Sequence, residues 1–210
     1  PCSAPAMAPV SINLDLTTAC NFACPHCVDS DIINTGGYLG LDGVKKSLDT
    51  LKAHGLLSVI LLGGGEPTLY KDFAEVVRYI KGQGLQLGIV TNGSRLERVA
   101  EIADLLGTHD WLRLSIDAAS QDTFDKLHRP KARVLLKDLL ENAQRIKIKN
   151  PDLSMGYSFV IMWEGLSLNN VPIAPNLQEM KDAAMLAAEH RFDYISFKPC
   201  LIRLPDLHQE

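Results

Sequence analysis

Hydrophobic and polar positions along this chain follow two repeating patterns, which predict strands and helices in strict alternation. The first strand is predicted over residues 11–17, where Ile12, Leu14 and Leu16 alternate with polar neighbours. The remaining strands are predicted at 57–62, 85–90, 111–117, 155–162 and 194–199. Apolar residues at helical spacing predict helices over 41–51, 73–82, 96–106, 123–127, 135–148 and 177–189. Such alternation indicates an α/β fold with a parallel sheet and right-handed crossovers.

Several predicted strands are polar on one face, although parallel strands covered on both faces are normally apolar throughout. The polar positions of the first, fourth and sixth strands include Asp15, Arg113, Asp117 and Lys198. We expect the polar face to line a lumen that holds a ligand near the carboxyl ends of the strands. We also expect these four charges to neutralise one another in part. Periodicity alone leaves open whether the sheet is a barrel or a doubly wound sheet with a structural ion-pair cluster.

The chain of 210 residues is 46% hydrophobic and 22% charged, which supplies enough apolar chain for one globular domain. A formal net charge of -4 without a basic stripe argues against a nucleic-acid partner. No apolar run approaches the roughly 20 residues that a membrane span needs. Residues 1–10 lack a signal-peptide pattern and are expected to form a flexible lead-in to a core domain over 11–210. Because the chain starts at Pro1, we expect residues to be missing at either end.

The segment after the first strand holds Cys20, Cys24 and Cys27 within eight residues. Clustered thiols in a chain without an export signal predict metal or redox chemistry in a reducing compartment, the cytoplasm. Three thiolates can hold three irons of a cubic iron–sulfur cluster, which normally takes four. The fourth iron then keeps an open coordination position, as catalytic metal sites do.

Two other sites can be built from the same residues. Cys24-Pro25-His26-Cys27 also matches the dithiol of thioredoxin-like oxidases, in which a helix N-terminus stabilises the thiolate. That interpretation leaves Cys20 without a role. A zinc site would need a fourth ligand such as His26, and adjacent residues such as His26 and Cys27 rarely chelate one tetrahedral ion well.

Glycines and polar side chains follow the predicted strands at their carboxyl ends. Gly63, Gly64 and Gly65 let the backbone approach a ligand closely, and the carboxylate of Glu66 can meet an ammonium group. An ordinary turn is the alternative. The third and fourth strands end in Thr91, Asn92, Ser115 and Asp117. Ser115 and Asp117 point to one face and can reach one ligand, unless Asp117 caps the next helix and Thr91-Asn92-Gly93 is only a turn.

The CxxxCxxC spacing of Cys20, Cys24 and Cys27, with an aromatic residue before the third cysteine, resembles the radical S-adenosylmethionine (radical SAM) superfamily. The later stretch Gly63-Gly64-Gly65-Glu66-Pro67 matches a second motif of that family. The resemblance implies a partial (β/α)6 TIM-like barrel with parallel strands. It also implies a 4Fe-4S cluster on the three cysteines and S-adenosyl-L-methionine bound at the open iron.

The resemblance further implies which residues bind the cofactor. The Gly-Gly-Glu stretch would meet the methionine amino group, and groups at the strand ends would meet its carboxylate and the ribose. The implied cofactor-binding residues are Phe22, His26, Gly64, Gly65, Glu66, Thr91, Asn92, Ser115, Asp117 and Lys198. The fifth strand would hold the adenine, but this chain lacks the glycine-containing motif found there in relatives.

The implied reaction is reductive cleavage of S-adenosylmethionine to a 5′-deoxyadenosyl radical, which abstracts hydrogen from a peptide or a small molecule. A low-potential donor of the flavodoxin or ferredoxin type would supply the electron. A C-terminal segment outside these residues is expected to close the barrel. Cys200, beside the barrel mouth, is a candidate hydrogen-atom donor, although a free cysteine more often only packs. Cys2 is expected to be incidental.

Overall fold

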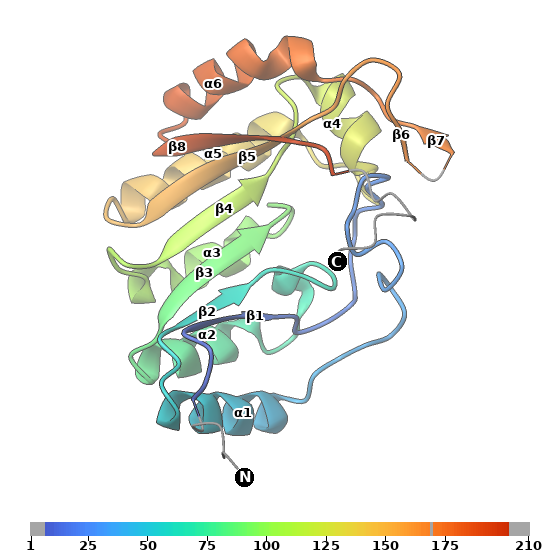
Figure 1. The fold of residues 1–210 in the computed structure, drawn as a ribbon. Helices are drawn as coiled ribbons and strands as arrows, with labels where there is room; N and C mark the ends of the chain where they lie inside the picture. Colours follow the sequence, from blue (N-terminus) through green and yellow to red (C-terminus); the bar gives the residue numbers. More distant parts are fainter. Residues whose placement is uncertain (1–6, 169, 202–210) are drawn as a thin grey trace.

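The computed structural model describes residues 7–168 and 170–201 and contains one large parallel sheet. The spatial order of its strands is their order in the chain (Figure 1). The strands are β1 (Ser11–Leu14), β2 (Ser58–Leu61), β3 (Gln86–Thr91), β4 (Trp111–Ser115), β5 (Ser154–Ile161) and β8 (Tyr194–Pro199). This order is that of a barrel left open between β1 and β8, so the expected partial (β/α)6 barrel is confirmed and the doubly wound alternative is wrong.

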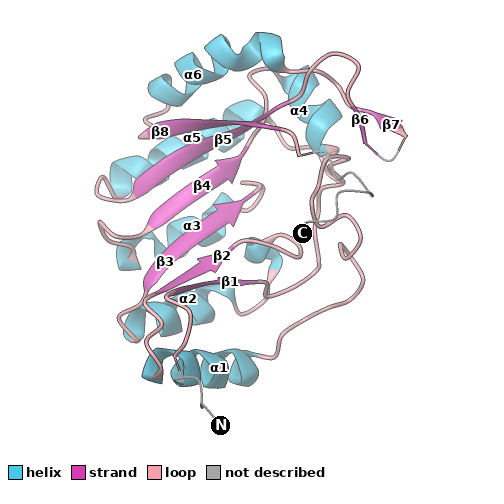
Figure 2. Ribbon diagram, in the orientation of Figure 1, coloured by secondary structure: helices cyan, strands magenta, loops and turns pink. Residues whose placement is uncertain are grey.

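Helices connect the strands and lie along the outer side of the curved sheet (Figure 2). They are α1 (Leu41–Ala53), α2 (Phe73–Gly82), α3 (Leu96–Ile102), α4 (Gln121–His128), α5 (Leu136–Lys149) and α6 (Met180–Glu189). Short 3-10 segments are η1 (Pro67–Leu69), η2 (Ala103–Leu105) and η3 (Leu177–Glu179). The predicted helices over 96–106 and 177–189 are therefore each divided into an α-helical and a 3-10 part.

The hydrophobic core lies between the sheet and these helices. Leu61, Ile89, Leu112 and Met155 occupy one row of the strand register, and all four side chains are fully buried. Residues one position along each strand face the lumen instead. Burying such rows of aliphatic side chains is the main term that stabilises a domain of this kind.

The expected alternation is confirmed, but the expected neutralisation of the lumen charges is wrong. Asp117 pairs with His26, and Asp15 accepts a hydrogen bond from the backbone N–H of Gly63. Within the described part of the chain, neither Arg113 nor Lys198 forms a salt bridge. The two carboxylates therefore have partners other than Arg113 and Lys198.

Two strands end earlier than predicted. Beyond Leu14 the chain makes only isolated bridges, from Thr17 to Tyr38 and to Gly64, because it turns to bring the cysteine segment beside β2. β4 ends at Ser115 and not at Asp117, whose φ of 53° is incompatible with an extended strand. The predicted loop over 163–175 holds a small antiparallel hairpin, β6 (Ser167–Leu168) and β7 (Val171–Pro172).

Cys2 and most of the expected lead-in lie outside the described residues, as do the last nine positions of the chain. Ala8 is described, and its N–H donates to the carbonyl of His54 at the end of α1. Among the described residues, no helix combines the length and the apolar character that a membrane crossing requires.

Candidate cofactor site

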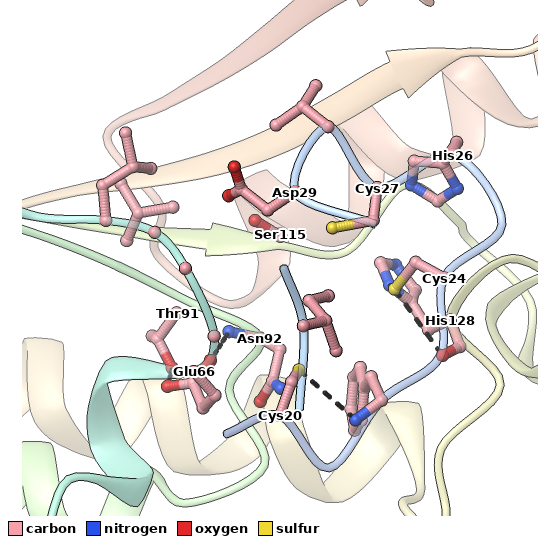
Figure 3. Close-up of a pocket in the computed structure, with 18 of the residues that line it drawn as sticks. Cys20, Cys24, His26, Cys27, Asp29, Glu66, Thr91, Asn92, Ser115 and His128 are labelled. Carbon is pink, nitrogen blue, oxygen red and sulfur yellow. Dashed lines mark hydrogen bonds between the residues drawn. The ribbon is translucent and has the colours of Figure 1, made fainter. Parts of the chain in front are cut away.

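A cavity of about 250 Å³ opens at the carboxyl ends of the strands. The segment that carries the cysteines covers one side, and the glycine turn after β2 and the ends of β3, β4 and β5 form the rest (Figure 3). The residues expected to bind a cofactor that line it are Cys20, Phe22, Cys24, His26, Cys27, Gly64, Gly65, Glu66, Thr91, Asn92, Ser115 and Asp117. The structure thus brings together residues from four separate stretches of the sequence.

The cysteine segment is fixed to the glycine turn by backbone hydrogen bonds. The N–H of Gly65 donates to the carbonyl of Thr17 at 2.8 Å, and that of Glu66 donates to Ala19 at 2.8 Å. A Cβ at Gly65 would lie 2.1 Å from the carbonyl oxygen of Ala19, and Gly64 has a φ of 69°. The glycines are therefore required for contact with the protein's own backbone as well as for access to the cavity.

The three thiols are free and half-buried, and their side chains line one cavity. Burial raises the pKa of each thiol above its ordinary value, and the neighbouring Cys27 adds to this effect at Cys24. Thiols of raised pKa become ligands only when a metal displaces the proton. A redox-active dithiol needs the opposite, a thiolate stabilised by its surroundings. This environment fits a metal cluster and opposes the thioredoxin-like alternative.

A buried network joins this segment to the end of β4. His26 Nε2 lies 3.2 Å from Asp117 Oδ2, and His128 Nε2 lies 3.6 Å from the same oxygen. His128 Nδ1 lies 3.3 Å from Cys24 Sγ. Burial works to raise the pKa of Asp117, but the hydrogen bond from His26 and the nearby charge of His128 lower it below its ordinary value. Asp117 therefore stays ionised and orients His26, while Nε2 of His128 donates to the carbonyl of Ile116 at 2.7 Å.

His26 shows how a ligand would fit the cavity. Its Nε2 is hydrogen-bonded to Asp117, so His26 cannot act as a fourth zinc ligand through that atom. Its Nδ1 is buried and has no hydrogen-bond partner among the described residues. Buried polar atoms without partners are rare, and a bound ligand is one ordinary explanation. The residues present therefore fit a cluster on the three thiols with a polar cofactor beside it.

Glu66 lies deeper than the sequence suggested. Its carboxylate accepts hydrogen bonds from Thr68 Oγ1 and Thr91 Oγ1, each at 2.6 Å, and from the N–H of Asn92 at 2.7 Å. The side chain is only 3% exposed, and burial raises the pKa of its carboxyl group. Glu66 thus joins the turn after β2 to the end of β3, and the backbone of the glycine turn remains to meet a ligand.

Two expected residues lie outside the lining. Lys198 is exposed at the end of β8, and Cys200 is buried in a separate small cluster with Leu127 and Met162. Their proposed roles stay predictions. The sequence did not predict two residues near the site, His128 and Asn21. The side-chain amide of Asn21 donates to Ser94 and accepts from Asn92. A lone histidine at the end of an amphipathic helix gives no signal that could have identified His128.

Phe22, by contrast, is almost fully buried and packs edge-on against Phe124, with ring centroids 6.0 Å apart. Its ring anchors the cysteine segment to α4, and part of its side chain borders the cavity. Aromatic pairs in this geometry stabilise the surfaces they join.

Comparison with known proteins agrees with this geometry. The model of the radical SAM superfamily matches residues 14–171. An S-adenosylmethionine-dependent nucleotide dehydratase of Selenomonas ruminantium is 37% identical over 113 residues, which cover 53% of this chain and 40% of that protein. The mycofactocin maturase MftC of Mycobacterium tuberculosis is 34% identical over 122 residues, which cover 57% of this chain and 30% of the maturase. The chain spans well under half the length of these curated relatives.

Among solved structures, Streptococcus suis SuiB bound to its precursor peptide SuiA superposes with a TM-score of 0.75 at 16% identity. The superposition covers 92% of this chain and 40% of SuiB, and at this identity it supports the fold alone. The family model covers most of the chain, including the cysteine segment and the glycine turn. The chain therefore belongs to the radical SAM superfamily, whose enzymes use a 4Fe-4S cluster and S-adenosylmethionine and need a reductant.

Proposed function

We propose that this chain is the core of a radical enzyme that cleaves S-adenosylmethionine reductively and abstracts hydrogen from a substrate. The observation that carries the proposal is the convergence of three free thiols, a glycine turn and the orphaned Nδ1 of His26 on one cavity. When bound, the reduced cluster and cofactor supply the radical chemistry, and the protein positions them and excludes water.

Cys20, Cys24 and Cys27 would hold the cluster. His128 lies against Cys24, with Nδ1 3.3 Å from the sulfur. Because Nε2 of His128 donates to the carbonyl of Ile116, Nδ1 of the neutral ring is an acceptor and can receive the thiol proton of Cys24. The backbone at Gly64 and Gly65 would receive the cofactor's amino group.

The opposite wall of the cavity, at the ends of β4 and β5, would meet the ribose and adenine. Ser115 and Ser158 offer hydroxyl groups there, and Val160 offers an apolar surface. Asp117 accepts from Nε2 of His26 and so fixes its tautomer, which leaves Nδ1 of the neutral ring to accept one hydrogen bond from the cofactor.

The substrate and partners belong to the proposal as well. A relative named as a nucleotide dehydratase and a similar fold solved with a bound precursor peptide support a nucleotide or a peptide as substrate. A flavodoxin or ferredoxin type of protein would supply the electron. Free thiols lining an accessible cavity favour a reducing, cytoplasmic setting.

The test compares Cys20→Ala with Cys200→Ala, because Cys200 is also a free buried thiol but lies outside the cavity. After anaerobic reconstitution with iron and sulfide, the protein is reduced and given S-adenosylmethionine, and 5′-deoxyadenosine is measured. We expect Cys20→Ala to lose the cluster absorption and product formation, and Cys200→Ala to keep the cluster. Failure of the wild type to take up iron, with a reversible Cys24–Cys27 disulfide, would overturn the proposal in favour of an oxidoreductase.

A further inference from the structure

Arg113 lies on the lumen-facing side of the sheet, one layer below the cofactor site, and has no ion-pair partner among the described residues. Arg113 lies on β4 between Val90 of β3 and Gly156 of β5. It lies two residues before Ser115, and alternation along a strand places both side chains on the same face. Ser115 and Val90 line the cofactor cavity, so Arg113 faces the same lumen closer to the amino ends of the strands.

One aromatic ring lies against this guanidinium, and a second lines the same cavity. Its Cζ lies 5.6 Å from the ring centroid of Trp111. The ring of Tyr194 lies against Gly156, where a Cβ would be 2.2 Å from the tyrosine Cζ. Arg113, Trp111 and Tyr194 line a second cavity of about 330 Å³, together with Ser154 and residues 108–110.

No carboxylate of the described residues pairs with Arg113, and its Nε is buried without a hydrogen-bond partner. The acid in this cavity, Asp110, is already bound by Lys81 Nζ at 2.7 Å and by the N–H of Leu87 at 2.6 Å. Arg113 as a whole is half-buried, but a buried N–H without a partner is rare in proteins, and a bound group is one ordinary explanation. An anion from outside the chain that enters the lumen would supply the missing acceptor for Nε and a counter-charge for the guanidinium.

We propose that Arg113 binds an anionic group of the substrate, a phosphate or a carboxylate, while Trp111 and Tyr194 contact its less polar part. This inference rests on the proposed function and narrows its substrate to an anionic one. The planar guanidinium fork matches both oxyanions through paired N–H donors. Two residues along a strand span about 7 Å, so the anion would lie about that far below the level of Ser115.

The experiment uses the cluster-loaded protein with S-adenosylmethionine and no reductant, so that no turnover occurs. Inorganic phosphate, tripolyphosphate and glutarate are titrated separately at constant ionic strength by isothermal titration calorimetry. We expect saturable binding of at least one probe, weakened about tenfold or more in Arg113→Gln and less in Arg113→Lys, which keeps the charge but loses the fork. Preference for the phosphates or for glutarate identifies which oxyanion the substrate carries.

Arg145→Gln is the matched control, because Arg145 is an exposed arginine on α5, and it should bind the probes as the wild type does. Circular dichroism checks that each variant is folded. If Arg113→Gln does not fold, the wild type is compared with Arg113→Lys alone. The inference would be overturned if the wild type bound none of the probes saturably. It would also be overturned if wild type, Arg113→Lys and Arg113→Gln all bound a probe with equal affinity. The titration needs no radical chemistry, so its failure is distinct from absent 5′-deoxyadenosine formation, which would count against the proposed function.

Discussion

At the scale of single residues, buried polar side chains in this molecule divide into those that hold the site together and those left open for a ligand. Glu66 belongs to the first group, because every hydrogen bond found for its carboxylate is to Thr68, Thr91 or Asn92. Nδ1 of His26 and Nε of Arg113 belong to the second group. The motif predicted that Glu66 matters, but only its neighbours show that it joins β2 to β3.

We expect Glu66→Gln to destabilise the protein by about 2–3 kcal/mol, because an amide oxygen cannot replace both carboxylate oxygens as acceptors and buried donors are left unpaired. Urea unfolding monitored by circular dichroism measures the free energy of unfolding. Glu164→Gln, at an exposed glutamate of the β5–β6 connection, is the control and should change it little. Equal stability of Glu66→Gln and wild type would show that the four hydrogen bonds contribute nothing net.

At the scale of elements, one side chain connects the last helix to the start of α4. Glu179, at the end of η3, accepts from Ser120 Oγ and Thr123 Oγ1 at 2.6 Å each and from the N–H of Ser120 at 3.1 Å. Burial works to raise the pKa of Glu179, but these hydrogen bonds lower it below its ordinary value of 4.5. The sequence predicted a helix over 177–189 but not this contact, which joins residues nearly sixty positions apart.

Because the pKa of Glu179 is lower in the folded than in the unfolded state, its contribution to stability is present above about pH 4.5 and is lost as pH falls through the folded value. We expect Glu179→Gln to lower the free energy of unfolding by about 1–2 kcal/mol at pH 7, since the side chain is partly exposed. Urea unfolding from pH 7 down to pH 3 should show this difference shrinking below about pH 4.5.

Glu189→Gln, at an exposed glutamate of α6, is the matched control and should show no comparable loss at pH 7. A difference between Glu179→Gln and wild type that stays constant across the pH range would contradict the assigned hydrogen bonds.

At the scale of the whole molecule, the barrel is open between β1 and β8, and its cofactor cavity is built from segments spread over most of the chain. A ligand in that cavity touches the cysteine segment, the glycine turn and the ends of β4 and β5 at once. Bound ligand should therefore stabilise distant parts of the fold together.

We expect S-adenosylmethionine, added to the cluster-loaded protein, to slow amide hydrogen exchange at residues 20–29, 63–66 and 115–117. Exchange in α1, which lies on the outer side of the sheet away from the cavity, is the internal control and should not change. Hydrogen–deuterium exchange read by mass spectrometry measures both. Protection confined to the cysteine segment would mean that the ends of the strands do not take part in binding.

The sequence by itself determined the order of strands and helices, the polar face of the sheet and the two motifs that identify the family. These features depend on the spacing of residues that are close in the chain, and this spacing can be read directly from the sequence. Only the tertiary structure decided that His128 lies against Cys24 from 104 positions away, and that Nε of Arg113 has no hydrogen-bond partner among the described residues. Those outcomes depend on strand register and sheet curvature, which bring distant residues together and which no local pattern encodes.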